Sequence, residues 1–293
     1  MRRRTFLKLA GLASLYPTPL LAATPAREPS VVGVAEGKDH AQVTRTALTL
    51  IGGMRRFVKP GDVVVVKPNM GWDRTPEQAA NTNPLVVRAV VEEALAAGAK
   101  KVKVFDRTCN DERRCYVNSG IAEALRGMKN VEVKQIEPER YRKVPLNGAV
   151  LKEWELYGEA LTANVFINVP VAKHHGLTRL TLGLKNVMGV MGGNRGSIHK
   201  NIDQALADIN SVLKSHLTVI DATRVLTANG PQGGDLADVK VLNTVIASTD
   251  IVAADAYATT LFGMKPTDIG VTVAAAKRGI GEIDLKKVRV VKV

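Results

Sequence analysis

The chain has 293 residues, of which 45% are hydrophobic and 24% charged, and its formal net charge is +13. This is the composition of a globular protein with one large or two small domains, and it excludes a low-complexity chain. Nucleic acid is not the expected partner, because the bases are scattered and only 4% of residues are aromatic. The charge favours attraction to anionic small molecules or to anionic lipid surfaces.

The N-terminus resembles a twin-arginine export signal. Arg3-Arg4-Thr5-Phe6-Leu7-Lys8 is followed by a short apolar run over residues 9–16 and by Ala22-Ala23. A cleavable signal peptide is therefore predicted over residues 1–23, with the twin-arginine machinery as partner and the periplasm as destination. No stable membrane anchor is expected, since the run is far shorter than the ~20 residues of a membrane span. Removing the four bases of the signal leaves 37 bases against 28 acids, a net charge of +9.

From residue 31 onward, β-branched runs alternate with amphipathic segments. Strands are predicted over residues 31–34, 63–66, 101–105, 131–136, 164–169, 217–220 and 242–247. Helices are predicted over residues 42–57, 84–97 (with Asn83 as N-cap) and 116–128, and the last third is expected to be mostly helical. This alternation predicts an α/β fold, a mostly parallel sheet with helices on both faces. Residues 31–293 are expected to form a single such domain, with residues 137–163 as the seam if it is bilobal.

Polar side chains follow four of the predicted strands. In chain order, these residues are Lys67 and Asn69, then Asp106 and Thr108, then Asn168, Lys173 and His174, and finally Asp221. In open parallel sheets, ligands bind outside the carboxyl ends of the strands, where such loops converge. The pattern therefore predicts one crevice lined by these groups, although Asp and Asn at a single strand end are also common turn formers.

A glycine-rich segment over residues 184–199 is the second candidate for anion binding. Glycines before a helix start let backbone N–H groups approach an anion, and the helix dipole favours negative charge there. Lys185, Asn186 and Arg195 would add donors and countercharge, and Ser197 is expected to cap the helix that follows. A flexible surface loop is the alternative interpretation.

The candidate catalytic residues are Lys173, His174, His199 and Asp106. In this hypothesis Lys173 and Lys185 hold the anion, and His174 or His199 moves a proton at neutral pH. Asp106 or Asp221 would orient that histidine or bind a metal. One of the adjacent His174 and His175, with His199 and a carboxylate such as Asp106 or Asp221, would form a two-histidine, one-carboxylate metal site. The candidate ligands carried forward are His174, His199 and Asp221.

The two cysteines, Cys109 and Cys115, leave three alternatives open. In an oxidising compartment such a close pair is typical of a local disulfide. A metal-binding or redox-active pair and two free thiols are the other readings. The spacing is not a recognised zinc motif, and two cysteines cannot complete a four-thiolate site.

Several segments resemble the family named domain of unknown function 362. They are V-V-K-P-N-M-G-W with T-N-P, D-R-T-C-N, I-N-V-P-V-A-K-H-H and L-G-L-K-N-V-M-G-V, and the similarity spans about residues 31–264. Some members of that family carry ferredoxin-like cysteine clusters, which this chain lacks, so no iron–sulfur cluster is expected. A looser similarity, of fold only, to the N-terminal region of nickel-pincer lactate racemases implies a cofactor-handling crevice at the sheet.

The sequence as a whole favours an exported enzyme that acts on a small anionic metabolite. The predicted site residues could also hold a metal ion or an organic cofactor, and the sequence does not identify which. The alternative is a periplasmic ligand-binding or cofactor-delivery protein without turnover. The polar strand ends favour a site over a scaffold, but they do not separate catalysis from binding.

Overall fold

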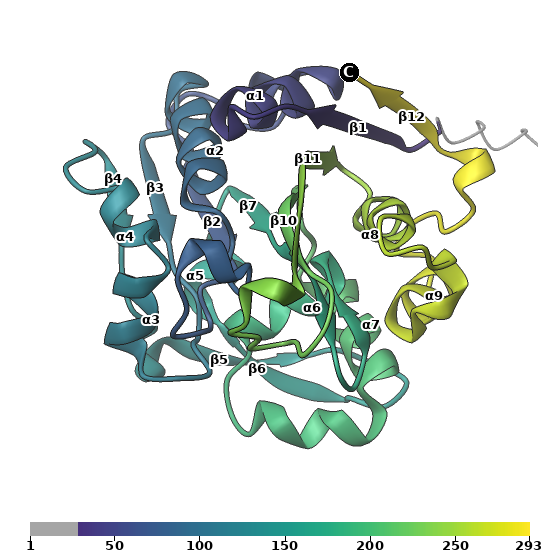
Figure 1. The fold of residues 1–293 in the computed structure, drawn as a ribbon. Helices are drawn as coiled ribbons and strands as arrows, with labels where there is room; N and C mark the ends of the chain where they lie inside the picture. Colours follow the sequence, from purple (N-terminus) through teal and green to yellow (C-terminus); the bar gives the residue numbers. More distant parts are fainter. Residues whose placement is uncertain (1–28) are drawn as a thin grey trace, which may run out of the picture.

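The structure, a computed structural model, describes residues 29–293, so the predicted signal peptide lies outside the described residues. Its centre is a run of five parallel strands (Figure 1). In spatial order they are β10 (Leu217–Leu226), β7 (Val165–Val169), β2 (Val63–Pro68), β3 (Lys101–Val104) and β4 (Val131–Val133). The predicted α/β class with a mostly parallel sheet is confirmed.

Further strands, one of them antiparallel to the central five, extend this sheet beyond β10. β11 (Val239–Ser248) pairs antiparallel with both β10 and β1 (Val31–Glu36), and β12 (Arg289–Lys292) closes the edge parallel to β1. β8 (Val171–His175) pairs with β10 and forms a hairpin with β9 (Arg179–Thr181). Residues 137–163, predicted as an irregular seam, contain a separate two-stranded sheet of β5 (Tyr141–Pro145) and β6 (Glu153–Tyr157).

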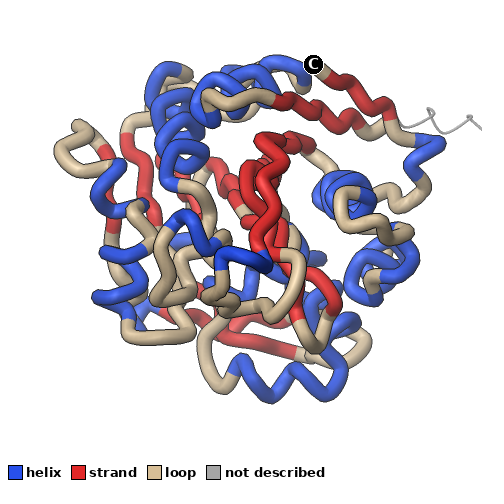
Figure 2. The backbone as a smooth tube through the Cα atoms, in the orientation of Figure 1, coloured by secondary structure: helices blue, strands red, loops and turns tan. Residues whose placement is uncertain are grey.

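Helices cover both faces of the sheet, as the blue segments on either side of the red strands show (Figure 2). One face carries α1 (His40–Leu50), α2 (Pro84–Ala96), α3 (Glu112–Asn118) and α4 (Ile121–Ala124). The other carries α5 (Gly158–Thr162), α6 (Gly183–Asn186), α7 (Ile202–Val212), α8 (Ile251–Thr260) and α9 (Gly270–Lys277). The side chains of β2 alternate between the two faces of the sheet. Val64 and Val66 belong to the hydrophobic cluster under α1–α4, and Val65 belongs to the cluster under α5–α9.

Glycines explain where the predicted helices differ from the observed ones. α2 begins as predicted, with the Asn83 side chain accepting a hydrogen bond from the Leu85 N–H and Pro84 in the first turn. The helix predicted over residues 42–57 ends at Leu50, because Gly52 and Gly53 adopt positive φ values. The helix predicted over residues 116–128 is divided in the same way at Gly120, between α3 and α4.

Two further boundaries differ from prediction. β10 does not end at residue 220 but continues to Leu226, because β11 pairs with it along its length. The helix after the glycine-rich segment begins at Ile202, preceded by a 3₁₀ turn, η5 (Arg195–Asn201). The Ser197 hydroxyl donates to the Asn194 carbonyl, so Ser197 is not the predicted helix cap.

The strand order places a crevice beside β2. The chain moves outward from β2 to β3 and β4, and β7 then lies on the opposite side of β2. Loops leaving the carboxyl ends of β2 and β7 therefore diverge, and such a switch point is where ligands bind in open α/β sheets. Among the described residues, no helix is long and apolar enough to cross a membrane.

Candidate functional site

A cavity of about 320 Å³ lies at the carboxyl ends of β2 and β3, next to the β8–β9 hairpin. Trp72, Cys109 and Met188 contribute to its wall. Its charged and polar lining consists of Lys67, Asn69, Asp106, Arg107, Lys173, His175, Thr181, Lys185, Asn186, Arg195 and His199. Five of these side chains are lysine or arginine and one is a carboxylate, so the cavity has an excess of positive charge.

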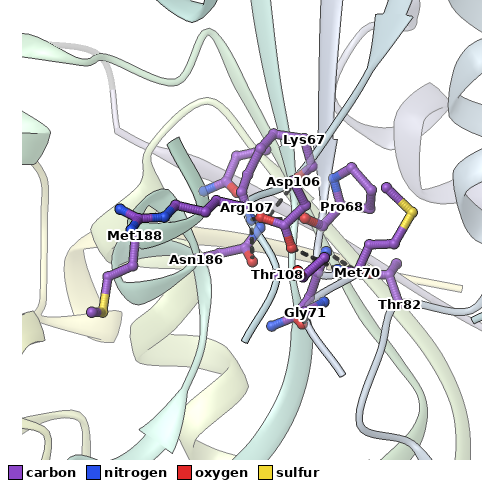
Figure 3. A network of polar contacts seen from close by, with 12 residues as sticks. Lys67, Pro68, Met70, Gly71, Thr82, Asp106, Arg107, Thr108, Asn186 and Met188 are labelled. Carbon is purple, nitrogen blue, oxygen red and sulfur yellow. Dashed lines mark hydrogen bonds and ion pairs between the residues drawn. The ribbon is translucent and has the colours of Figure 1, made fainter. Parts of the chain in front are cut away.

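A buried ion pair joins the ends of β2 and β3. Lys67 Nζ lies 2.8 Å from Asp106 Oδ1 and also donates to Asn186 Oδ1 (2.9 Å) and the Pro68 carbonyl (2.7 Å). These side chains point toward one another in Figure 3. Burial lowers the pKa of Lys67, and Asp106 opposes that shift. Because all three Lys67 N–H groups have partners, this pair holds the strand ends together rather than offering a free charge.

Two asparagines connect this ion pair to α6. Asn186 Nδ2 donates to Asn168 Oδ1 (2.8 Å) and to the Lys67 carbonyl (3.2 Å). Asn168 Nδ2 in turn donates to the Gly183 carbonyl, and Asp255 accepts from the Gly183 and Leu184 N–H groups. The start of α6 is thereby fixed against β7, which sets the position of Lys185 one residue before Asn186.

The ammonium groups of Lys173 and Lys185 differ in whether they have hydrogen-bond partners in the protein. Lys173 is buried, donates to the Ala80 (2.6 Å) and Pro231 (2.9 Å) carbonyls, and lies 5.3 Å from the centroid of a Trp72 ring. Burial, with Lys185 nearby, lowers the pKa of Lys173 well below its ordinary value. Among residues 29–293, Lys185 has neither a hydrogen-bond nor an ion-pair partner. Burial lowers its pKa to about 8.

The two histidines that line the cavity have opposite tautomers. His175 Nδ1 accepts from the Leu177 (3.1 Å) and Thr178 (3.3 Å) N–H groups, so its proton is on Nε2. Burial, followed by the charges of Lys185 and Lys173, lowers the pKa of His175 to about 3, which keeps the ring neutral. His199 Nδ1 lies 2.7 Å from the Gly196 carbonyl and must donate to it. The neutral His199 ring therefore keeps a lone pair on Nε2.

Arg195 ties the loop after β3 to the glycine-rich segment. Its guanidinium donates to the Arg107 (2.8 Å), Thr108 (2.6 Å) and Met188 (3.2 Å) carbonyls and lies 3.3 Å from Cys109 Sγ. No carboxylate among the described residues pairs with it, so its positive charge still faces the cavity. Gly189 and Gly196 line the cavity, whereas a side chain at Gly192 would meet Tyr141 and Glu155 instead.

The cavity brings together most of the predicted site residues. Those that line it are Lys67, Asn69, Asp106, Lys173, Lys185, Asn186, Arg195 and His199. Asn168 lies behind this lining, and Thr108 contributes its carbonyl to Arg195 while its hydroxyl donates to the Asn110 carbonyl. His174 lies off the cavity, where its Nδ1 accepts from the Gly230 N–H.

The predicted metal set is not assembled. Asp221 lies within β10 and accepts hydrogen bonds from the Asn83 and Thr223 N–H groups, and neither it nor His174 reaches the cavity that His199 lines. The sequence pattern predicts Asp221 in a loop after a shorter strand, whereas β10 continues through it to Leu226. In the part of the chain that the structure describes, no three His, Cys, Asp or Glu side chains are grouped to hold a metal.

Both cysteines are free thiols in the structure, so the disulfide alternative is not realised in it. Cys109 is exposed and lines the cavity. Cys115 is buried in α3, and burial raises the pKa of its thiol to about 11.

Sequence reasoning did not single out Trp72 or Thr181, and of the two adjacent histidines it carried His174 forward as the candidate. A usable signal favoured His175: Lys173 and His175 are two residues apart, and in a strand such residues share a face. Thr181 had none, since it reaches the cavity only through the pairing of β9 with β8.

Taken together, these observations define an α/β protein with a positively charged cavity at the switch point of a mostly parallel sheet. Residues 64–260 match the family model described as domain of unknown function (DUF362), and the chain belongs to this family. It is 28% identical over 244 residues to a thylakoid-associated protein of Synechocystis sp., covering 80% of this chain and 74% of that one. A solved structure of the lactate racemase apoprotein from Thermoanaerobacterium thermosaccharolyticum is similar with a TM-score of 0.48 and 11% identity. That match covers 80% of this chain and 57% of the racemase chain.

Proposed function

We propose that this protein is an enzyme that binds a small organic anion in the cavity and moves a proton on it. The observation that carries the proposal is the ammonium group of Lys185, which has no partner among the described residues in a cavity with five basic side chains and one carboxylate. An uncompensated, partly desolvated charge is costly unless a ligand neutralises it. An anion of a size to fit about 320 Å³ would do so.

The proton-transfer role falls to His199. Its Nδ1–H is held by the Gly196 carbonyl, and its exposed ring presents the Nε2 lone pair at a cavity that the residue helps to line. A histidine fixed in this way can act as the general base that accepts a proton from the ligand. His175 is the complementary group, because its neutral ring offers only an N–H donor.

Anion binding is tested by calorimetry at pH 7 with malonate, inorganic phosphate and acetate, and with methylammonium as the cationic control. We expect the anions to bind and methylammonium not to bind. Lys200→Met is the matched control for Lys185→Met, because Lys200 is exposed, follows His199 directly and does not line the cavity. Absence of binding by all three anions would refute the proposal.

Catalysis is tested on the anion that copurifies with the protein, identified by native mass spectrometry. His199→Asn should retain binding and lower turnover by about 10²–10⁴-fold. A wild-type protein that releases this anion chemically unchanged would instead support the alternative, a binding or delivery protein without turnover.

We also propose that the protein is exported to the periplasm by the twin-arginine pathway, which rests on the R-R-T-F-L-K run of residues 3–8. Fractionation of a Gram-negative host should find the wild type in the periplasm and an Arg3→Lys/Arg4→Lys variant in the cytoplasm. The membrane fraction is assayed too, because the Synechocystis relative is described as thylakoid-associated. Equal distribution of the two forms would refute export by this route.

A further inference from the structure

One hydroxyl group on the cavity wall has no partner. Thr181 is 4% exposed, lines the cavity, and its Oγ1 makes no hydrogen bond to any described residue. Leaving a buried polar group unsatisfied costs about 1–3 kcal/mol. A ligand atom placed in the cavity would supply the missing partner.

The β8–β9 hairpin sets the direction of this hydroxyl. Thr181 is the direct cross-strand partner of Lys173, so the two side chains lie on the same face of the hairpin. His175 is two residues from Lys173 and shares that face, whereas His174 points to the opposite one. Lys185 follows four residues after Thr181, in α6.

The groups on this wall are hydrogen-bond donors toward the cavity. His175 has its proton on Nε2, because Nδ1 already accepts two backbone N–H groups. Among residues 29–293, the Lys185 ammonium has no partner and the Thr181 hydroxyl makes no hydrogen bond, so both can donate to a ligand. Asp106, the one carboxylate of the lining, is engaged with Lys67 and with the Met70 N–H. A ligand group that meets this wall must therefore be an acceptor.

We propose that Thr181, His175 and Lys185 form an oxyanion cradle that binds the carboxylate or phosphoryl group of the ligand. The proposal rests on the proposed function and deepens it, since it assigns the anionic end of the ligand to one wall of the cavity. Thr181 and His175 supply directed hydrogen bonds, and Lys185 supplies the charge. The reacting part of the ligand then extends toward His199, which lines the same cavity from η5.

The test compares Thr181→Val with Thr272→Val. Thr272 lies in α9, is also buried, and its hydroxyl also has no partner among the described residues, but it does not line the cavity. Valine keeps the shape and removes the hydroxyl, so neither variant should be less stable than the wild type without ligand. We expect Thr181→Val to weaken the binding of malonate and inorganic phosphate about 5- to 20-fold, and Thr272→Val to leave both unchanged.

Thr181→Ser adds a check that does not depend on valine packing well, because serine restores the hydroxyl and should bind like the wild type. Loss for only one of malonate and phosphate identifies which oxyanion the cradle takes and supports the proposal. If wild type and Thr181→Val bind both anions equally well, the cradle is refuted while the proposed function stands. If the wild type binds neither, the proposed function fails with it.

Discussion

Replacing Lys185 with methionine should increase the stability of the folded protein and at the same time weaken its binding of anions. In the folded protein, burial lowers the pKa of Lys185 from 10.5 to about 8, which means that the fold disfavours the ammonium form. Methionine has a similar length and no charge, so it removes this cost. The same change removes the partnerless cation on which the proposed anion site depends.

The difference between a pKa of 10.5 and one of about 8 corresponds to at most about 3 kcal/mol. Because the Lys185 side chain is partly exposed, solvent screening reduces this to about 1–2 kcal/mol. For a domain of this size, such a gain raises the melting temperature by roughly 2–6 °C at pH 7. Binding of malonate should weaken by about 10-fold or more, as expected when a charge-assisted contact is lost.

The stabilisation depends on pH in a defined direction. Between pH 8 and 10.5 the unfolded chain keeps the Lys185 proton and the folded protein does not, so wild-type stability from this group rises across that window. The advantage of Lys185→Met should therefore shrink as the pH rises. Lys67, Lys173, Arg195 and the Cys109 thiol also face this position. Removing the Lys185 charge relieves part of the lowering of the Lys173 pKa, which adds to the stability gain of Lys185→Met at pH 7.

Differential scanning calorimetry at pH 7 and pH 10, with Lys200→Met and Lys185→Arg alongside, measures these effects. Lys185→Arg keeps the charge and should retain anion binding above pH 8, where binding to the wild type declines. A Lys185→Met variant that is destabilised at pH 7, or that binds malonate as the wild type does, would show that Lys185 is a structural residue and refute the reasoning.

Three further substitutions test how buried groups contribute to the stability of the fold. Gly189→Ala places a methyl group against the buried Asp106 carboxylate and should cost about 3–5 kcal/mol in urea unfolding, whereas Gly176→Ala, where the space is open, should cost little. Asp208→Ala leaves three backbone N–H groups of residues 149–151 without their acceptor and should cost about 3 kcal/mol at pH 7. Although burial opposes it, hydrogen bonds from these N–H groups lower the pKa of Asp208, so the loss should shrink as the pH falls below the ordinary carboxyl range. Burial raises the pKa of Asp255 to about 7, so wild-type stability should fall as pH rises from about 4 to 7, and Asp255→Asn should flatten that slope.

Local signals predicted most of the secondary structure and the class of fold. The valines of β2 are consecutive, and Asn83 and Pro84 are adjacent, so each of these two signals is local and predicts its own element. The spatial order of the strands depends on long-range pairing that no local pattern encodes. β11 and β12 are the clearest case: β11 pairs antiparallel with β10 and β1, and β12 pairs parallel with β1.

The site was predictable to the extent that it follows strand ends. Lys67 and Asp106 come together because their strands are parallel neighbours. His175 lines the cavity and the predicted His174 does not, because residues 171–175 form a strand, in which alternation turns one histidine to the cavity and the other away. Thr181 could not be predicted, because its position depends on hairpin register.

Some polar side chains of the cavity have hydrogen-bond partners in the protein and others have none, which implies that the former support the structure and the latter bind the ligand. Lys67, Asp106 and Asn186 saturate one another and fix the strand ends without any ligand. Thr181 and Lys185 have unused hydrogen-bonding capacity and belong to the contiguous hairpin and helix that this network supports. The donors are therefore held in place before the ligand arrives, which lowers the entropic cost of binding. Changes in the network should act first on stability, whereas changes at Thr181 and Lys185 should act first on affinity.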